Sequence, residues 1–383
     1  MLTPQSPADL ATALKSAADQ KRTISLAGNS TKRRMAGPVE PADVEITTKC
    51  LRRVLQYEPH DLTISVEAGL PWAEFNRLIA QNGQMVPLDP PFAEGATVGG
   101  VVASNCNGPR RRLYGTARDM VIGMHFATLE GKLVQTGGMV VKNVAGLDMA
   151  KLMIGSFGTL AAIAVVNFKL TPAPEAERSF LLPFPTGFDA IAARNRILAS
   201  PLQPSALDLL NPAAAAFFGA GGWVLALRAG GSPAPLHRYE SELTLIAGRL
   251  LVENSECPES FWGDLESFTP QFLDRQPDGA VVRVSCTLKD VADVMESFPG
   301  PTVARAASGV CYGYFEQADA TVDWFARTRE KGWKAVIEFA PEAGQRTLEL
   351  WPSPGGDFEI MQRIKSLFDP SSLLNRGRLY RRI

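Results

Sequence analysis

Glycine and small polar residues cluster in five segments of the first 160 residues, where the chain is best suited to contact a ligand. The segments are Gly28–Lys32, Ala96–Gly100, Tyr114–Asp119, Lys142–Gly146 and Gly155–Leu160. Glycine lets the backbone approach a ligand without a Cβ clash, and successive N–H groups in such loops form anion sites. Together the segments predict backbone that follows a long, phosphate-bearing ligand. No G-x-G-x-x-G motif follows the first predicted strand, so a Rossmann dinucleotide fold is not expected.

Two of these segments carry specific chemistry. Gly28–Lys32 ends a predicted strand, so its N–H groups, two hydroxyls and lysine can face a pyrophosphate. The alternative is an ordinary Asn/Ser/Gly turn. Ala96–Ser104 follows the rigid turn Leu88–Pro91, and its small residues leave room for a cofactor against the backbone. The alternative for this segment is a tightly packed buried helix.

Charge and cysteine usage exclude other classes of protein. Lys and Arg number 39 and Asp and Glu number 40, which argues against nucleic acid as the main partner. The basic clusters Lys32–Arg34 and Arg110–Arg112 are equally well explained as solvated turns. The five cysteines show no C-x-x-C and no iron–sulfur spacing, and an odd count suits a reducing compartment. No metal site is predicted.

The sequence predicts a cytoplasmic protein. Residues Met1–Gln5 show no positive segment followed by an apolar stretch, as a secretory signal would. No apolar run approaches the roughly 18 residues that a spanning helix needs. Any contact with a membrane is therefore expected only through partners, at the inner face of the cytoplasmic membrane.

The periodicity of apolar residues predicts an α+β chain that begins with a domain over 1–172. A helix starts at Ser6–Pro7, a short one covers 51–56, and another runs from Pro71 to Gly83. Residues 1 to about 85 are expected to form one β-α-β unit. Predicted strands of this domain cover 23–27, 44–47, 62–67, 120–129, 133–136 and 160–170, with a hairpin turn at Glu130–Gly131.

Proline punctuation at Thr171–Pro174 predicts a second domain over 173–355. Predicted strands lie near 178–184, 205–210, 222–228, 249–253, 280–285, 302–306, 310–315 and 333–339, and helices near 187–199, 234–247, 259–274, 288–298 and 319–330. The strand–helix–strand rhythm occurs twice, which predicts a duplicated ferredoxin-like unit over one antiparallel sheet. Segment 213–222 receives no assignment. A last helix, 357–368, opens a third segment over 356–383.

The glycine segments resemble the flavin-binding domain of the vanillyl-alcohol oxidase and p-cresol methylhydroxylase superfamily. More narrowly, they resemble the FAD-binding E subunits of bacterial glycolate oxidases, most strongly over residues 20–172 and again in the tail 368–380. The tail is similar to the closing F-D-P…L-N-P-G-[RK] of that family, with Arg376 in place of the proline. Leu147 stands where relatives carry an aromatic residue. The resemblance implies a PCMH-type domain in two subdomains, a ferredoxin-like cap, and a tail that returns to the flavin domain.

The segments and the resemblance together predict a cofactor site for FAD. FAD is expected to be bound without a covalent link, because the first glycine loop contains no His or Cys. The predicted cofactor-binding residues are Gly28, Asn29, Ser30, Thr31, Lys32, Pro90, Ala96, Thr97, Val98, Gly99, Gly100, Ser104, Arg118, Asp119, Gly146, Asp148, Gly155, Ser156, Gly158, Thr159 and Asn375.

The shortage of histidine separates this chain from the dehydrogenating subunits that the resemblance brings to mind. Those subunits carry a histidine cluster in the second domain, whereas here only His60, His125 and His237 occur. No catalytic base is assigned, and Arg305 is the one candidate for holding a carboxylate.

The resulting hypothesis is an FAD subunit of a glycolate oxidase complex, which oxidises a small D-2-hydroxy acid and passes electrons to a membrane acceptor. Its partners would be a catalytic FAD subunit and an iron–sulfur subunit. Two alternatives stay open. One is a self-sufficient FAD-dependent D-2-hydroxy-acid dehydrogenase that uses Arg305. The other is a structural subunit that no longer holds flavin.

Overall fold

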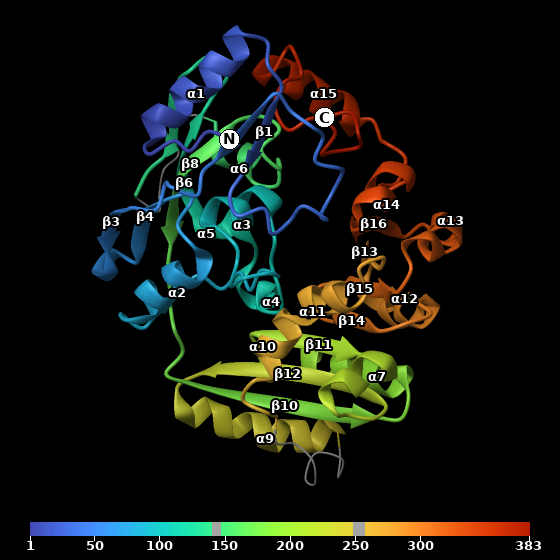
Figure 1. The fold of residues 1–383 in the computed structure, drawn as a ribbon. Coiled ribbons are helices and arrows are strands. Elements are labelled where there is room, and N and C mark those ends of the chain that lie inside the picture. Colours follow the sequence, from blue (N-terminus) through green and yellow to red (C-terminus); the bar gives the residue numbers. More distant parts are fainter. Residues whose placement is uncertain (140–146, 248–256) are drawn as a thin grey trace. The chain divides into compact units, whose positions relative to one another are not determined.

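A computed structural model describes residues 1–139, 147–247 and 257–383. The chain divides into two compact units (Figure 1). Unit 1 comprises residues 1–107, 115–173 and 353–383, and unit 2 comprises 108–114 and 174–352. The short segment 108–114 thus belongs to unit 2, although the sequence on either side of it belongs to unit 1. Within the described residues, no helix is both long and apolar enough to cross a membrane.

Unit 1 begins with α1 (Pro7–Asp19), which starts as predicted because the Ser6 hydroxyl accepts a hydrogen bond from the Asp9 N–H. Strands β1 (Ile24–Ala27) and β2 (Val44–Thr47) pair in parallel. Helix α1 packs against strands of the main sheet of this unit and covers them (Figure 1).

The main sheet of unit 1 has five antiparallel strands in the order β3-β4-β8-β6-β7. They are β3 (Val54–Glu58), β4 (Thr63–Glu67), β8 (Ala162–Lys169), β6 (Val121–Ala127) and β7 (Leu133–Gly137). β8 is central and almost fully buried. The turn between β6 and β7 is the predicted hairpin turn, with Gly131 at φ +78°. Two further short strands, β5 (Gln84–Met85) and β9 (Thr171–Pro172), pair with each other.

Two predictions for this region are wrong. Residues 54–58 form the edge strand β3 and not a helix over 51–56, because they pair with β4 across the turn at Pro59–Asp61. The first 85 residues are also no closed β-α-β unit, since β4 pairs with β8 about a hundred residues later in the chain. Strand pairing outweighed the local pattern in both cases, with the next strand along the chain in the first and with a strand far along the chain in the second.

The longer helices of unit 1 lie at its two ends and are α1 and α15 (Asp357–Phe368). The helices between them are shorter: α2 (Trp72–Ala80), α3 (Val98–Ser104), α5 (Ala117–Met120) and α6 (Ala150–Met153). The residues after α15 lie against β1, where the Ile24 N–H donates to the Leu373 carbonyl (2.8 Å) and the Asn375 N–H donates to the Ile24 carbonyl (2.9 Å). The tail therefore adds a third, irregular strand beside β1.

Unit 2 is a seven-stranded antiparallel sheet in the order β10-β12-β11-β14-β15-β13-β16. The strands are β10 (Ala176–Phe184), β11 (Ala206–Leu210), β12 (Trp223–Gly231), β13 (Ala280–Ser285), β14 (Thr302–Arg305), β15 (Val310–Phe315) and β16 (Lys334–Phe339). The last four strands have the 4-1-3-2 order of a ferredoxin-like unit, and the first three repeat its 1-3-2 part. The predicted antiparallel α+β architecture is confirmed.

Helices cover this sheet on both faces. Helices α7 (Gly187–Ala199), α9 (Pro233–Ala247), α12 (Val291–Ser297) and α13 (Thr321–Lys331) enclose the main apolar core. The predicted helix 259–274 is split into α10 (Phe261–Glu266) and α11 (Phe268–Arg275), and the unassigned segment forms α8 (Pro212–Ala215) with a 3-10 turn. Two further short helices are α4 (Arg111–Tyr114) and α14 (Glu342–Thr347). The predicted strand 249–253 lies outside the described residues.

Candidate functional site

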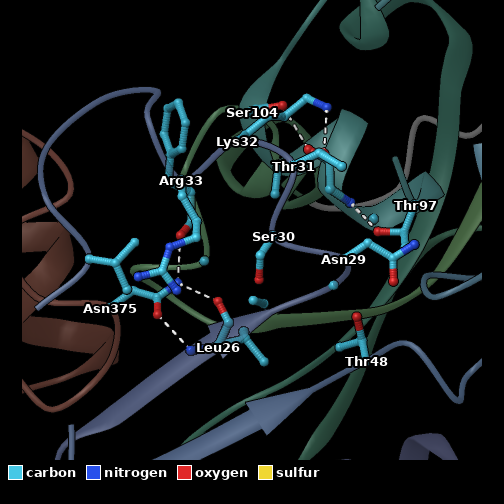
Figure 2. A pocket seen from close by; sticks show the side chains of 18 of the residues that line it. Leu26, Asn29, Ser30, Thr31, Lys32, Arg33, Thr48, Thr97, Ser104 and Asn375 are labelled. Carbon is cyan, nitrogen blue, oxygen red and sulfur yellow. Dashed lines mark hydrogen bonds between the residues drawn. The ribbon is translucent and has the colours of Figure 1, made fainter. Parts of the chain in front are cut away.

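Unit 1 contains a pocket with a cavity volume of about 150 Å³ (Figure 2). Its wall combines β1 and the following loop, the first turns of α3, the turn at Phe157–Gly158, and the C-terminal tail. Many predicted cofactor-binding residues meet here. Those that line the pocket are Gly28, Asn29, Ser30, Thr31, Lys32, Thr97, Gly99, Gly100, Ser104, Gly158 and Asn375.

The loop after β1 is shaped by two backbone features. Ser30 has φ +59°, the left-handed region, so the chain turns sharply at the centre of the segment. A Cβ on Gly28 would lie 2.4 Å from Thr97 Oγ1, so only glycine allows this loop to pass so close to the start of α3. The requirement for glycine here comes from contact with Thr97, which itself lines the pocket.

Lys32 is a buried cation in the pocket wall. Its side chain extends beside Thr31 (Figure 2), donates a hydrogen bond to Thr31 Oγ1 (3.2 Å) and lies over the Phe92 ring, 5.8 Å from its centroid. Burial lowers the pKa of the Lys32 ammonium. No acidic residue in the described parts of the chain forms an ion pair with it. A buried charge without an anionic partner favours an anionic ligand.

Arg378 is the second buried cation of the pocket wall, and sequence analysis did not single it out. Its guanidinium donates to four backbone carbonyls of the loop 32–37 and lies 5.4 Å from the centroid of the Phe157 ring. Burial, with a smaller contribution from Arg33, lowers the pKa of Arg378 to about 10, so it remains charged at neutral pH. Its one sequence signal is the basic residue that closes the tail motif.

Asn375 joins the tail to the pocket wall. Its side chain reproduces strand pairing with β1: Oδ1 accepts from the Leu26 N–H (2.7 Å) and Nδ2 donates to the Leu26 carbonyl (3.0 Å) (Figure 2). Nδ2 also donates to the Phe157 carbonyl (2.8 Å). Asn375 adopts φ +43°, which Asn tolerates better than most residues. The side chain thus holds three segments of the wall together.

The remaining predicted residues of unit 1 do not line this pocket, and several have structural partners. Arg118 donates to the Lys151 carbonyl (3.0 Å). The Asp119 carboxylate accepts from the N–H of Thr116, the N-cap residue of α5 (2.8 Å). Asp148 forms an exposed ion pair with Lys151 (3.2 Å). Pro90, Ala96, Val98, Gly155, Ser156 and Thr159 also lie outside the pocket wall. Gly146 falls outside the described residues.

Several lining residues were missed by sequence analysis. They are Ser25, Leu26, Ala27, Arg33, Val39, Thr48, Ala103, Phe157, Ile163 and Arg378. Half of them are apolar or small residues of β1, α3 and β8 that look like core in the sequence. Ala27 and Arg33 directly flank the segment Gly28–Lys32, and Ala103 and Phe157 lie inside the segments 96–104 and 155–160, so the glycine pattern could have indicated these four.

Arg305, the candidate for holding a carboxylate, lies on β14 in unit 2 and already has an acidic partner. Its guanidinium donates to the carboxylate of Asp208 on β11, a side chain with no exposed surface. The Arg305 Nε atom is buried without a hydrogen-bond partner. The Asp208 carboxylate therefore already neutralises most of the positive charge on Arg305 that would attract a substrate carboxylate.

A buried carboxyl group lies near Arg305 and was also missed. Glu338 on β16 has its Oε2 atom 3.7 Å from Arg283 Nε, and this oxygen is buried without a hydrogen-bond partner. Burial raises the pKa of Glu338 despite Arg283 and Arg305. Burial also raises the pKa of Tyr312, and that of Tyr314 to about 12, so neither phenol is a base near neutral pH.

The three histidines do not line the pocket. His60 is exposed in the turn before β4, and His237 is exposed on α9 of unit 2. His125 lies on β6, where burial lowers its pKa.

Comparison with known proteins agrees with the site. Residues 1–137 match the family described as "FAD binding domain", and residues 353–379 match "FAD linked oxidases, C-terminal domain". The chain is 28% identical to glycolate oxidase subunit GlcE of Escherichia coli K12 over 95% of its own length and 94% of that protein. It is 31% identical to glycolate oxidase subunit GlcD of Bacillus subtilis 168, over 43% of this chain and 35% of that one. The mitochondrial cytochrome-linked D-lactate dehydrogenase of Arabidopsis thaliana is 32% identical over 54% of this chain and 36% of its own length.

Two solved structures share the fold. Alkyldihydroxyacetonephosphate synthase superposes with a TM-score of 0.72 at 18% identity, over 98% of this chain and 75% of that one. The 4-ethylphenol oxidase of Gulosibacter chungangensis superposes with a TM-score of 0.74 at 15% identity, over 100% of this chain and 89% of that one. These likenesses confirm the predicted fold class, and the family matches confirm the predicted resemblance and its cofactor, FAD.

Proposed function

Because residues 1–137 match an FAD binding domain, we propose that the chain holds FAD non-covalently in the unit 1 pocket, with the cofactor's pyrophosphate near Lys32. One observation carries this proposal: the buried cation Lys32 lines the cavity without an acidic ion-pair partner among the described residues, whereas the Arg378 guanidinium is already bonded to four backbone carbonyls. A pyrophosphate supplies the missing negative charge. The cavity is small for a whole dinucleotide, so part of FAD extends beyond it.

The residues of the pocket fit the parts of such a cofactor. Ser30, Thr31 and Asn29 offer hydroxyl and amide groups along the loop, and Gly99 and Gly100 leave backbone uncovered at the start of α3. When bound, FAD supplies an acceptor for two electrons. The protein's own contribution is to bind the phosphates through charge, to orient the cofactor through the loop and tail, and to exclude water with apolar side chains such as Leu26.

At the level of the complex, we propose that this chain is the FAD-binding subunit of a glycolate oxidase-type assembly acting on small 2-hydroxy acids. Similarity to subunit GlcE over nearly the whole chain supports this role. Its partners are a GlcD-like catalytic FAD subunit and an iron–sulfur subunit that passes electrons onward. Membrane contact then belongs to the partners, and the chain itself stays on the cytoplasmic side.

Purification of the chain with and without its partners tests this function. The chain alone is expected to carry FAD that acid or heat releases, with a flavin absorbance band in the purified protein. Tagged chain is expected to bring down a second flavoprotein and an iron–sulfur protein, and only that assembly oxidises glycolate. A colourless chain that takes up no added FAD would contradict the cofactor role and leave the structural alternative.

A second candidate function is a self-sufficient 2-hydroxy-acid dehydrogenase, which one observation favours. Glu338 is a buried carboxyl group with a raised pKa and an unpaired oxygen, beside Arg283 and near Arg305. A carboxyl group tuned in this way suits a general base. Loss of glycolate-dependent flavin reduction in an isolated Glu338→Gln protein, with wild-type chain active alone, would support this candidate.

A further inference from the structure

One side chain of the C-terminal tail is bonded to a whole loop of the pocket wall. Through Nη1, Arg378 donates to the carbonyl oxygens of Gly37 (2.6 Å) and Arg33 (3.4 Å). Through Nη2, it donates to those of Met35 (2.8 Å) and Lys32 (3.2 Å). The Gly37 N–H in turn donates to the Arg378 carbonyl (2.9 Å). These bonds constrain a loop that lies outside every helix and named strand of the unit.

The tail and the loop approach so closely that little else fits between them. A Cβ on Gly37 would lie 2.1 Å from the Gly377 carbonyl oxygen, so glycine is required at this contact. On its other side, the Arg378 guanidinium lies over the ring of Phe157, which adopts φ +52°. Arg378 therefore stands between two segments that both line the pocket.

The geometry connects Arg378 with Lys32. One of the four carbonyls that Arg378 holds belongs to Lys32 itself, so the guanidinium fixes the backbone from which the Lys32 side chain enters the pocket. Two like charges in one cavity repel each other, and the carbonyl oxygens around Arg378 reduce that repulsion. Arg suits this task because its planar fork presents five donors, whereas the single ammonium of Lys presents three donors from one point.

We propose that Arg378 is a positioning residue of the cofactor site: it holds the backbone of residues 32–37 so that the Lys32 ammonium stays inside the pocket. This role rests on the FAD function proposed above. The C-terminal tail then contributes to cofactor binding, because its Arg378 holds the backbone of Lys32, which carries positive charge in the pocket.

A double-mutant cycle on FAD affinity tests the proposal. The dissociation constant of FAD is measured by flavin fluorescence for wild type, Arg378→Met, Lys32→Met and the double variant. Each single change is expected to weaken binding roughly 10- to 100-fold, as expected for loss of hydrogen bonds to a charged group. The double variant should bind little more weakly than Lys32→Met alone, because Arg378 acts through Lys32.

A conservative variant and a control complete the design. Arg378→Lys should bind FAD as weakly as Arg378→Met, because a single ammonium cannot hold four carbonyls, and it replaces Arg378→Met in the cycle if that protein does not fold. Arg376→Ala is the matched control. This tail arginine is exposed and donates to the Pro41 carbonyl (3.1 Å), so its loss should leave FAD affinity unchanged.

Additive effects in the cycle, or wild-type affinity in Arg378→Lys, would overturn the positioning role while the FAD function stands. A wild-type chain that binds no FAD would instead overturn the proposed function, and the positioning role with it.

Discussion

Lys32 and Arg378 bring two positive charges into one pocket, and burial lowers the pKa of both side chains. The fold bears this cost without an acidic ion-pair partner in the described residues, which is the mark of a site completed by an anion. A pocket that served only packing would have gained stability from apolar residues at these two positions.

The first prediction concerns pH. Only protonated Lys32 attracts the cofactor's phosphates, and its pKa in the free protein lies below 10.5. FAD affinity should therefore be greatest at pH values below the Lys32 pKa, and it should fall as the pH is raised through that pKa into the alkaline range. The stability of the free protein has the opposite sign: the unfolded chain binds this proton more tightly, so the Lys32 contribution to stability increases with pH. Titrations of wild type and Lys32→Met across this range check both trends, and a slope that persists in Lys32→Met would assign it to another group.

The second prediction concerns the Arg305–Asp208 pair. Asp208→Asn removes the carboxylate from a buried guanidinium and should lower the unfolding free energy by about 3 to 5 kcal/mol. Urea unfolding measures the change. Glu177→Gln on β10, the edge strand of the same sheet, is the control, because the Glu177–Arg228 pair (2.6 Å) is partly exposed and should matter by less than about 1 kcal/mol. Equal losses in the two variants would show that Arg305 has another partner.

Sequence reasoning was strongest where backbone conformation itself carries the signal. The loop Gly28–Lys32 and Asn375 were predicted from turn chemistry and tail motif, and both line the pocket. It failed for Arg378, whose four carbonyl partners lie more than 340 positions earlier. It also left Asp208 unnoticed as the partner of Arg305, because pairing between β11 and β14 brings together residues 97 positions apart.

At the scale of elements, the tail is held against the rest of unit 1 by a buried polar cluster formed by Lys365 and Asp369, called the clasp below. Lys365 on α15 donates to the Asp369 carboxylate (2.7 Å), the Thr159 carbonyl (2.7 Å) and the Leu374 carbonyl (3.0 Å). The carboxylate also accepts from the N–H groups of Leu373 (2.9 Å) and Leu374 (2.8 Å). The clasp fixes the start of the segment that delivers Asn375 and Arg378 to the pocket.

The third prediction follows from this clasp. Asp369→Ala leaves the Lys365 ammonium buried without its carboxylate and should destabilise the docked tail by about 3 kcal/mol or more. Hydrogen exchange at the Ile24 and Asn375 amides, which bond β1 to the tail, should accelerate most. Glu359→Ala on the exposed side of the same helix is the control, and exchange that stays slow in Asp369→Ala would show that the tail docks without the clasp.

The fourth prediction concerns the contact between the first loop and α3. A side chain at Gly28 would displace Thr97, whose Oγ1 accepts from the Gly100 N–H (3.2 Å) at the helix start. Gly28→Val should therefore abolish FAD retention by shifting two walls of the pocket at once. Visible absorbance of the purified protein measures retention, and circular dichroism confirms that it is folded. Full retention in a folded Gly28→Val protein would place the cofactor elsewhere.

Element prediction succeeded where a short sequence signal marks the element and failed where only pairing with another strand defines it. The cap of α1, the hairpin of β6 and β7, and the strands of unit 2 follow from short sequence signals. The sequence predicts a helix over 51–56 because the exposed residues of β3 show no alternation, and pairing with β4 is what makes this segment a strand.

At the scale of the whole molecule, unit 1 has the features of a cofactor site, whereas Arg305 and the buried tyrosines of unit 2 are paired or have pKa values that burial shifts away from neutrality. Unit 1 has a pocket lined by two buried cations, neither of which has an acidic ion-pair partner in the described residues, by glycine backbone, and by a tail that Lys365 and Asp369 hold in place. In unit 2, Arg305 is paired with Asp208, and burial raises the pKa of Tyr312 and Tyr314. This imbalance is what a subunit specialised in holding flavin would show, and it supports the reading of the chain as one member of a larger assembly.

The last prediction is that the isolated, FAD-loaded chain does not oxidise 2-hydroxy acids at a useful rate. Oxidation requires removal of the hydroxyl proton as well as transfer of two electrons, and a positioned base contributes about 10²- to 10⁴-fold to such a step. No histidine of the chain lines the pocket, and the buried tyrosines cannot lose a proton near neutral pH. Anaerobic mixing with glycolate and D-lactate, followed at the oxidised flavin band, measures the outcome. Rapid bleaching without any other subunit would show a complete dehydrogenase. In that event Glu338→Gln would identify its base, because the amide keeps the shape of the side chain but cannot accept the proton.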